Sequence, residues 1–164
     1  RNEDAMELLL TEDTPENRTK AYCHYHLVIE GVLAQTGYYG LSKAYSGDFE
    51  DQGLPELPGL VEGLTLIRQD EGRHVGFGMA KLKQLVHEEG VDPQLIADVT
   101  DELLVLVNDT VTPDDEDEVY EDLQVLDDDE LTNYAVEKHA QRLGQITNRD
   151  EAIPDVDQLT ALEG

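Results

Sequence analysis

Apolar side chains in this chain recur every three or four residues, the spacing of one face of an α-helix. The pattern is clear in four segments: residues 15–33, 58–89, 93–107 and 127–143. A shorter apolar run at residues 5–10 is typical of the end of a helix. No segment shows the strong alternation of apolar and polar residues that is typical of a half-buried strand. The sequence therefore predicts an all-α fold.

Local signals set the expected helix boundaries. The pairs Thr14–Pro15 and Asp92–Pro93 each combine an N-cap side chain with a proline in the first turn, which predicts two helix starts. The glycines of Gly37–Gly40 and the Gly- and Pro-containing segment 47–58 are typical of a connection. We therefore expect the second helix to end at Gly37–Gly40.

A chain of 164 residues is long enough for one domain with a hydrophobic core. We expect a helical bundle over residues 1–147 and an irregular acidic tail over residues 148–164, with an acidic loop at 113–118. Because the chain begins with Arg1 and its first helix looks truncated, we expect it to be the C-terminal part of a longer protein.

Acidic residues outnumber basic ones by 38 to 11, which gives a formal charge of −27. Nucleic-acid binding through a basic face is therefore not expected. The excess is spread along the whole chain, a pattern typical of proteins adapted to high salt, where screening makes self-repulsion tolerable. The alternative is an ordinary acidic protein with a disordered acidic patch. We favour salt adaptation and a halophilic source.

Salt adaptation predicts that the stability of the fold rises steeply with ionic strength. Screening weakens the repulsion between carboxylates, and that repulsion is stronger in the compact state than in the unfolded chain. Thermal melts from low to molar potassium chloride measure the effect. A melting temperature that stays flat over this range would count against salt adaptation.

Cysteine content and hydropathy indicate the expected cellular compartment. Cys23 is the only cysteine, so an intramolecular disulfide is impossible and the cytosol is the natural compartment. No run approaches the roughly 18 to 20 apolar residues that span a bilayer, and no leader precedes the first helix. We expect a cytoplasmic protein without a membrane partner.

The candidate chemistry lies at Asp70-Glu71-Gly72-Arg73-His74, inside the long predicted helix 58–89. Residues three apart share a helix face, so Glu71 and His74 can direct a carboxylate and an imidazole at one point. This is the Glu-x-x-His half-motif of di-iron and di-manganese carboxylate proteins. Glu30 is a lone acid in an apolar helix and needs a charge partner. Two carboxylates and an imidazole suit iron or manganese.

The sequence is also compatible with an alternative in which these residues bind no metal. Glu30 would pair with Arg73, and His74 would be a hydrogen-bonded residue of the core. Asp70 is a candidate partner for a ligating histidine, although an exposed acid is more common at such a position.

The remaining histidines and tyrosines give weaker signals. His26 lies one turn before Glu30 and can reach the same face, but a packed or capping role is more common. Tyr22 and Tyr25 could be redox-active near a metal, although buried tyrosines are usually core residues. The other three histidines are expected to be solvated: His24, His87 and His139. Cys23 lacks the context of a catalytic thiol.

Two segments together carry a resemblance to a known family. Residues Tyr25–Tyr38 and Asp70–Gly78 resemble the second half of the ribonucleotide reductase small-subunit superfamily, and most closely its ligand-binding oxidases. The resemblance extends over about residues 5–145. It implies a partial ferritin-like helical bundle.

The resemblance also implies a function, that of a dioxygen-activating oxidoreductase with a dinuclear non-haem Mn/Fe or di-iron centre. Glu30, Glu71 and His74 would be three of its six metal ligands. A long-chain fatty acid would bind beside the metals. Tyr25, five residues before Glu30, would be the residue oxidised in the reaction.

The first-half carboxylate and the first Glu-x-x-His of the family are not in this chain. Either they belong to an absent N-terminal half, which we favour, or two copies complete the site as a homodimer. Three other readings stay open. One is a ribonucleotide reductase small subunit, which the lack of tyrosine after Tyr134 counts against. The others are a non-catalytic helical module and a symmetric, half-length ferritin-like iron protein.

Overall fold

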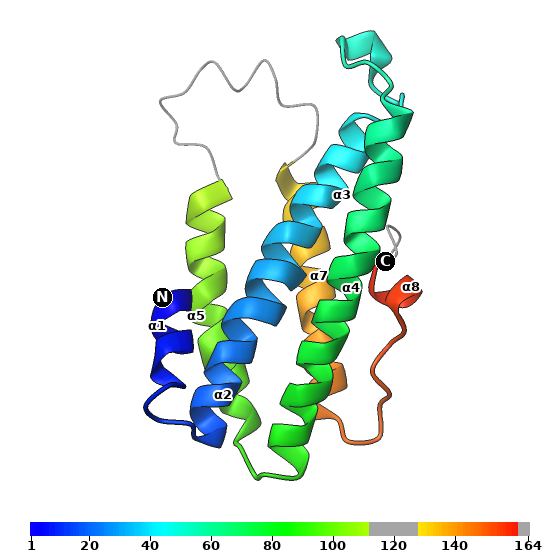
Figure 1. Cartoon of the computed structure of the whole chain (residues 1–164). Coiled ribbons are helices and arrows are strands. Elements are labelled where there is room, and N and C mark those ends of the chain that lie inside the picture. Colours follow the sequence, from blue (N-terminus) through cyan, green and yellow to red (C-terminus); the bar gives the residue numbers. More distant parts are fainter. Residues whose placement is uncertain (112–127, 161–164) are drawn as a thin grey trace.

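The computed structural model describes residues 1–111 and 128–160, and these ranges contain helices and no strand. The elements are α1 (Asn2–Leu8), α2 (Pro15–Tyr22), η1 (Cys23–Ala34), α3 (Gln35–Ala44), η2 (Glu50–Gln52), α4 (Pro58–His87), α5 (Pro93–Val111), α7 (Asp128–Thr147) and α8 (Val156–Leu159). The long helices lie side by side as a bundle (Figure 1). The all-α prediction is confirmed.

The elements α2, η1 and α3 follow one another as a single long rod (Figure 1). The predicted start is confirmed, because the Thr14 side chain accepts a hydrogen bond from the Asn17 backbone N–H at 3.2 Å. Its middle part, η1, is a π-helix, in which backbone N–H groups bond to the carbonyl five residues earlier. At its end, for example, the Gln35 N–H donates to the Glu30 carbonyl.

The predicted end of this rod at Gly37–Gly40 is wrong, because α3 continues to Ala44. Contacts with α4 and α7 offset the helix-destabilising effect of the two glycines. The Tyr39 ring stacks on Tyr134 of α7 with centroids 4.3 Å apart, and its hydroxyl donates to Glu130 at 2.5 Å. The chain changes direction after Ala44, at Gly47, whose φ of +102° favours glycine.

Two further predicted helices are confirmed. The helix α4 begins at Pro58 and ends at His87, close to the predicted range 58–89. Gly90, with φ +78°, follows it, and α5 begins at Pro93. The Asp92 side chain caps this start by accepting from the Gln94 backbone N–H at 2.9 Å.

The hydrophobic core lies between η1, α4, α5 and α7. Its buried members are Cys23, Leu27, Val75, Met79, Leu82, Leu85, Val91, Ile96, Ile146 and Leu159. Burying a leucine side chain of this kind stabilises the fold by about 1.5–3 kcal/mol. The core thereby fixes η1 against α4, the two helices that carry the candidate donors.

The segment predicted as an irregular tail contains the short helix α8. Asp155 and Gln158 form a capping box, and Leu159 packs into the core. The division of the chain after residue 147 stays a prediction. The predicted acidic loop at 113–118 lies outside the described residues. In the described ranges, every helix is too short or too polar to cross a bilayer.

Candidate metal centre

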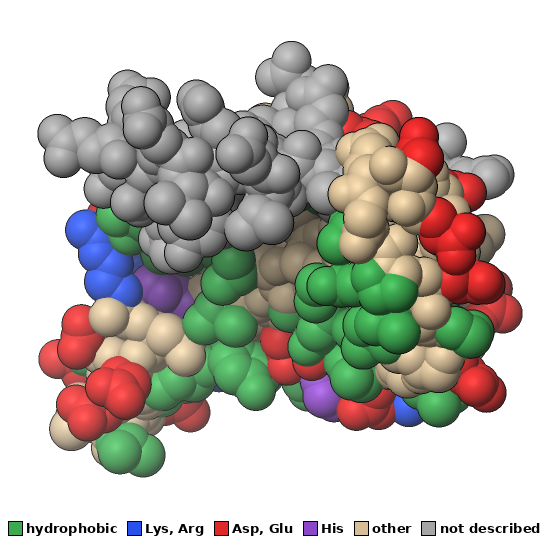
Figure 2. Space-filling model, turned by 90° about the horizontal axis from the view of Figure 1, so that it is seen from above, with side chains coloured by type: hydrophobic (Ala, Val, Ile, Leu, Met, Phe, Trp, Pro, Cys, Tyr) green, Lys and Arg blue, Asp and Glu red, His purple; other side chains and the backbone are tan. Residues whose placement is uncertain are grey.

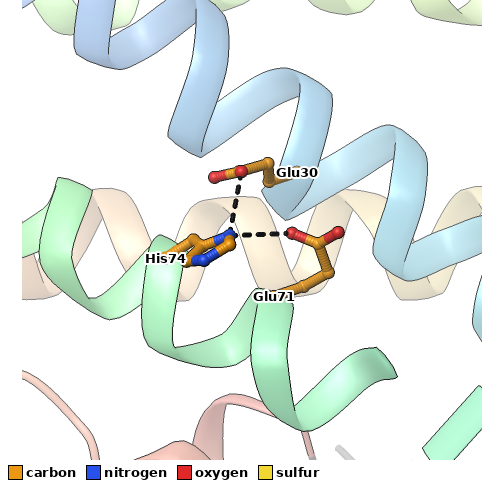
Figure 3. A group of neighbouring side chains, drawn as sticks. All are labelled: Glu30, Glu71 and His74. Atoms are coloured by element: carbon orange, nitrogen blue, oxygen red, sulfur yellow. Dashed lines mark hydrogen bonds and ion pairs between the residues drawn. The ribbon is translucent and has the colours of Figure 1, made fainter. Parts of the chain in front are cut away.

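Three side chains meet where η1 lies against α4 (Figure 3). Glu30 extends from η1, and Glu71 and His74 extend from α4, one turn apart, as their spacing predicts. His74 Nδ1 lies 3.1 Å from Glu30 Oε1 and 3.3 Å from Glu71 Oε2. One ligand atom from each residue lies within 4.8 Å of the other two.

The site is buried on one side and open on the other. Glu30 is 5% exposed, as expected for an acid amid apolar residues, whereas the His74 side chain is 48% exposed. His26 Nδ1 lies 2.7 Å from Glu30 Oε2 and orients the carboxylate, leaving its other oxygen directed at His74. The buried carboxylate is thus held between two imidazoles.

The charges around His74 favour its protonated form. Burial lowers the pKa of this imidazole, but the negative charges of Glu30 and Glu71, whose carboxylate oxygens lie 3.1 and 3.3 Å from Nδ1, together outweigh that effect. The net result is a pKa above the ordinary value of 6.5. Without metal, a proton can therefore occupy the point between the two carboxylates.

One oxygen at this point lacks a hydrogen bond. Glu71 Oε2 is a buried atom that accepts none, although His74 Nδ1 lies 3.3 Å away. Buried polar atoms of this kind are rare and call for an explanation such as an ion. A cation bound by Glu30, Glu71 and His74 would supply the missing partner, so these residues fit a metal. They are one-half of the set that holds two metals in ferritin-like proteins.

The alternative without metal is wrong in the partner of Arg73 and in the core position of His74, although His74 is hydrogen-bonded, to Glu30. Arg73 Nη2 lies 2.6 Å from Asp70 Oδ1, so its partner is Asp70 and not Glu30. His74 is half-exposed and does not belong to the core. Asp70 is exposed and is paired with Arg73. It is therefore the exposed acid that is more common at such a position, and not a partner of His74.

Tyr25 is 40% exposed and lies close enough to Glu30 and Glu71 for both charges to act on its phenol. Its ring meets that of His26 edge-on, with centroids 5.1 Å apart. The negative charge of Glu30 raises the pKa of Tyr25, with smaller contributions from burial and a hydrogen bond to Glu30. The phenol therefore keeps its proton at neutral pH. Its role as the oxidised residue stays a prediction.

Sequence reasoning understated His26 and missed Arg142. His26 is the partner of Glu30 and packs closely against Gly78 of α4. Its spacing of four residues from Glu30 was the available signal. Arg142 of α7 is buried, and its guanidinium donates to the carbonyl of Gly31, next to Glu30. Burial lowers the pKa of Arg142 to about 10, so it stays charged at neutral pH.

The remaining candidate residues divide into confirmed and corrected predictions. Cys23 is fully buried, and burial raises the pKa of its thiol to about 12, which agrees with an unreactive cysteine. His139 is buried, so its predicted solvated position is wrong. His87 is partly buried, with Nε2 lying 3.0 Å from the Ile146 carbonyl oxygen. Both histidines face neighbouring helices whose positions the sequence does not reveal.

The chain was compared with protein-family models and with solved structures, and only the solved structures gave a match. No protein-family model matches the chain. Among solved structures, it is similar to a variant of an R2-like ligand-binding oxidase with an aerobically reconstituted Mn/Fe cofactor, with 30% identity, a TM-score of 0.68 and coverage of 89% of this chain and 49% of that one. An R2-like ligand-binding oxidase without metal cofactor gives 28% identity, a TM-score of 0.69 and coverage of 89% and 54%.

The match covers most of this chain, but the chain spans only about half the length of the proteins it matches. It has the ferritin-like helical fold of R2-like oxidases over that half. The carboxylate and histidine group described above lies in this shared fold.

Proposed function

We propose that this chain forms half of a dinuclear non-haem metal centre, Mn/Fe or di-iron, in a dioxygen-activating oxidoreductase. The observation that carries the proposal is the convergence of Glu30, Glu71 and His74 at one point. Its likeness to oxidases that hold an Mn/Fe cofactor supports the same conclusion.

Each residue has a distinct part in this proposal. Glu30 and Glu71 supply negative charge, and His74 supplies the neutral nitrogen Nδ1 to one metal. His26 keeps the Glu30 carboxylate oriented through its 2.7 Å contact. When bound, the two metals would supply the electrons that reduce dioxygen. Tyr25 holds its phenolic proton at the edge of the site and is the proposed residue of oxidation.

The binding partners that we propose are based on the resemblance of this chain to the ligand-binding oxidases. The similar structures are described as ligand-binding oxidases. We extend this to a long-chain fatty-acid-like ligand next to the metals. A cytoplasmic location and a homodimeric state also belong to the proposal.

Reconstitution tests this function. Protein isolated from its native source without chelator is analysed for intact mass and metal, then stripped, loaded with Mn²⁺ and Fe²⁺ without oxygen, and exposed to air in an oxygen electrode. We expect close to two metals per complete site and oxygen uptake in proportion to bound metal. If the protein holds no metal and consumes no oxygen, the proposed function is wrong, and the non-catalytic helical module is the remaining interpretation.

Metal affinity is expected to depend on pH through His74. A metal needs the neutral imidazole, whereas the two carboxylates raise the pKa of His74 above its ordinary value of 6.5. Proton and metal therefore compete for Nδ1, and affinity falls as the pH is lowered through that raised pKa. Titration with Mn²⁺ between pH 5.5 and 8.5 measures this. An affinity that is constant over the range would argue against His74 as a ligand.

A further inference from the structure

Three basic side chains are buried where α7 packs against α4 and η1. Arg68 of α4 is 3% exposed, and Lys138 and Arg142 of α7 are 6% and 3% exposed. We call these three residues the buried cation cluster. Lysine and arginine are almost never fully buried in proteins unless they are paired with a negative group. The cluster therefore calls for an explanation of how its charge is balanced.

Tyr134 of α7 connects the members of the cluster. Tyr134, Lys138 and Arg142 follow one another at intervals of four residues, which places them on one face of α7. Arg68 Nη2 donates to the Tyr134 hydroxyl at 3.3 Å, and Lys138 Nζ lies 5.7 Å from the centroid of the Tyr134 ring. Burial and the positive charges of Arg142 and Arg68 lower the pKa of Lys138. The exposed neighbour Glu137 offsets only part of this effect, so the cations are close enough to repel one another.

Among the described residues, no acidic side chain forms an ion pair with the cluster. Arg68 donates to the Thr160 carbonyl at 2.7 Å, and Arg142 donates to the Gly31 carbonyl. These acceptors are neutral oxygens and do not balance the charge. Within the same ranges Lys138 Nζ has no hydrogen bond, and Arg68 Nε is a buried donor without a partner. Donors of two cluster members thus remain available to a further group.

The charge in this interior is opposite in sign to that of the chain as a whole. The formal charge is −27, and the face seen in Figure 2 shows many acidic and few basic side chains. In the described ranges Glu30 is the one buried acid, and it faces His26 and His74. Three of the eleven basic residues, by contrast, lie inside. Because buried charges are costly without partners, a negative group is expected beside them.

We propose that the buried cation cluster binds an oxyanion of the carboxylate or phosphate type between α4 and α7. Two guanidinium groups present planar forks of N–H donors, and this geometry matches the oxygens of a carboxylate or a phosphate. The Lys138 ammonium adds donors that are free of hydrogen bonds in the described part of the chain. The oxyanion is either a free ion or an aspartate or glutamate side chain from a segment outside the described residues. The site uses none of the three metal donors, so it does not depend on the proposed function.

Thermal melts of the purified protein test this site. Potassium phosphate or potassium acetate replaces potassium chloride at constant ionic strength, so that screening stays the same. Because phosphate stabilises folded proteins in general, the response of the wild type is compared with that of Lys138→Met, which removes one cation. Lys81→Met is the matched control. Lys81 Nζ also lies over an aromatic ring, 5.8 Å from the Phe77 centroid, but its side chain is only partly buried.

Two results would support the site and separate the two sources of the oxyanion. With a free ion, Lys138→Met should need about tenfold more anion than the wild type or Lys81→Met for the same stabilisation, because a charged hydrogen bond is lost. With a carboxylate of the protein, all three should respond equally to added anion. Lys138→Met should then melt below Lys81→Met, because the carboxylate has lost a buried partner. Equal responses, with Lys138→Met melting at or above Lys81→Met, would overturn the proposal.

Crystals of the wild-type protein grown with arsenate, an analogue of phosphate, test the same site without any variant. An anomalous peak at the arsenic edge beside Arg68 and Lys138 would show that the cluster binds a free ion. An aspartate or glutamate carboxylate in contact with the same two side chains would show that the protein itself supplies the oxyanion. A cluster that contacts neither an anion nor a carboxylate would overturn the proposal.

Discussion

Replacing Glu30 with alanine is expected to abolish metal binding while most of the helicity remains. The substitution removes the buried carboxylate that faces His74 at 3.1 Å and leaves Glu71 and His74 as an isolated pair on α4. Loss of an outer partner of a metal ligand typically costs about 10- to 100-fold in affinity, and loss of a ligand should cost more. Metal content after reconstitution, measured with the circular dichroism spectrum, gives the result.

Glu62→Ala is the matched control for this experiment. Glu62 is an exposed glutamate on α4, the same helix as two of the donors. Its replacement removes the same charge without touching the site, so metal content should match that of the wild type. Unchanged metal content in Glu30→Ala would exclude Glu30 as a ligand.

Replacing Gly78 with alanine is expected to destabilise the fold and the site together. An added Cβ at this position would lie 2.3 Å from the His26 Cβ and 2.7 Å from its Cγ. These atoms lie near the backbone of η1, so relief requires that α4 and η1 move apart. Overpacking of this kind costs about 1–3 kcal/mol. The melting temperature should fall by several degrees, at about 2–4 °C per kcal/mol.

Metal affinity should fall in the same variant, because His26 orients Glu30 and both lie on the helix that is displaced. Gly63→Ala is the matched control on α4, since an added Cβ there meets nothing within 4 Å. Alanine is the better helix former, so this change should stabilise the protein by about 0.5–1 kcal/mol. Equal melting temperatures for the two variants would contradict the close packing of η1 on α4.

The parts of the site that could be predicted depend on local geometry. Glu71 and His74 are three residues apart on one helix, so helical spacing alone brings them together. Glu30 is the one acid in an apolar stretch, which predicts its burial. That Glu30 meets His74 on another helix did not follow from spacing, and the competing pairing with Arg73 was equally open. Arg73 instead pairs with Asp70 on its own helix, where the two are also three residues apart.

The features that could not be predicted depend on packing between distant segments. The π-helical form of η1 has no signature in its apolar sequence. The glycines of α3 read as a helix end, and only contacts such as the stacking of Tyr39 on Tyr134 explain its continuation. Arg142 and His139 are polar residues on a helix with few apolar positions, yet α7 turns them into the interior. The short helix α8 was not predicted either; the structure shows that a capping box of Asp155 and Gln158 starts it.

Anomalous diffraction would show whether Glu30, Glu71 and His74 bind a metal. Crystals of the chain grown with Mn²⁺ and Fe²⁺ would be measured on both sides of the manganese and iron absorption edges. We expect an anomalous peak within coordination distance of Glu30, Glu71 and His74 Nδ1. Metal bound only elsewhere, or these three side chains in direct contact with no peak between them at saturating metal, would contradict it.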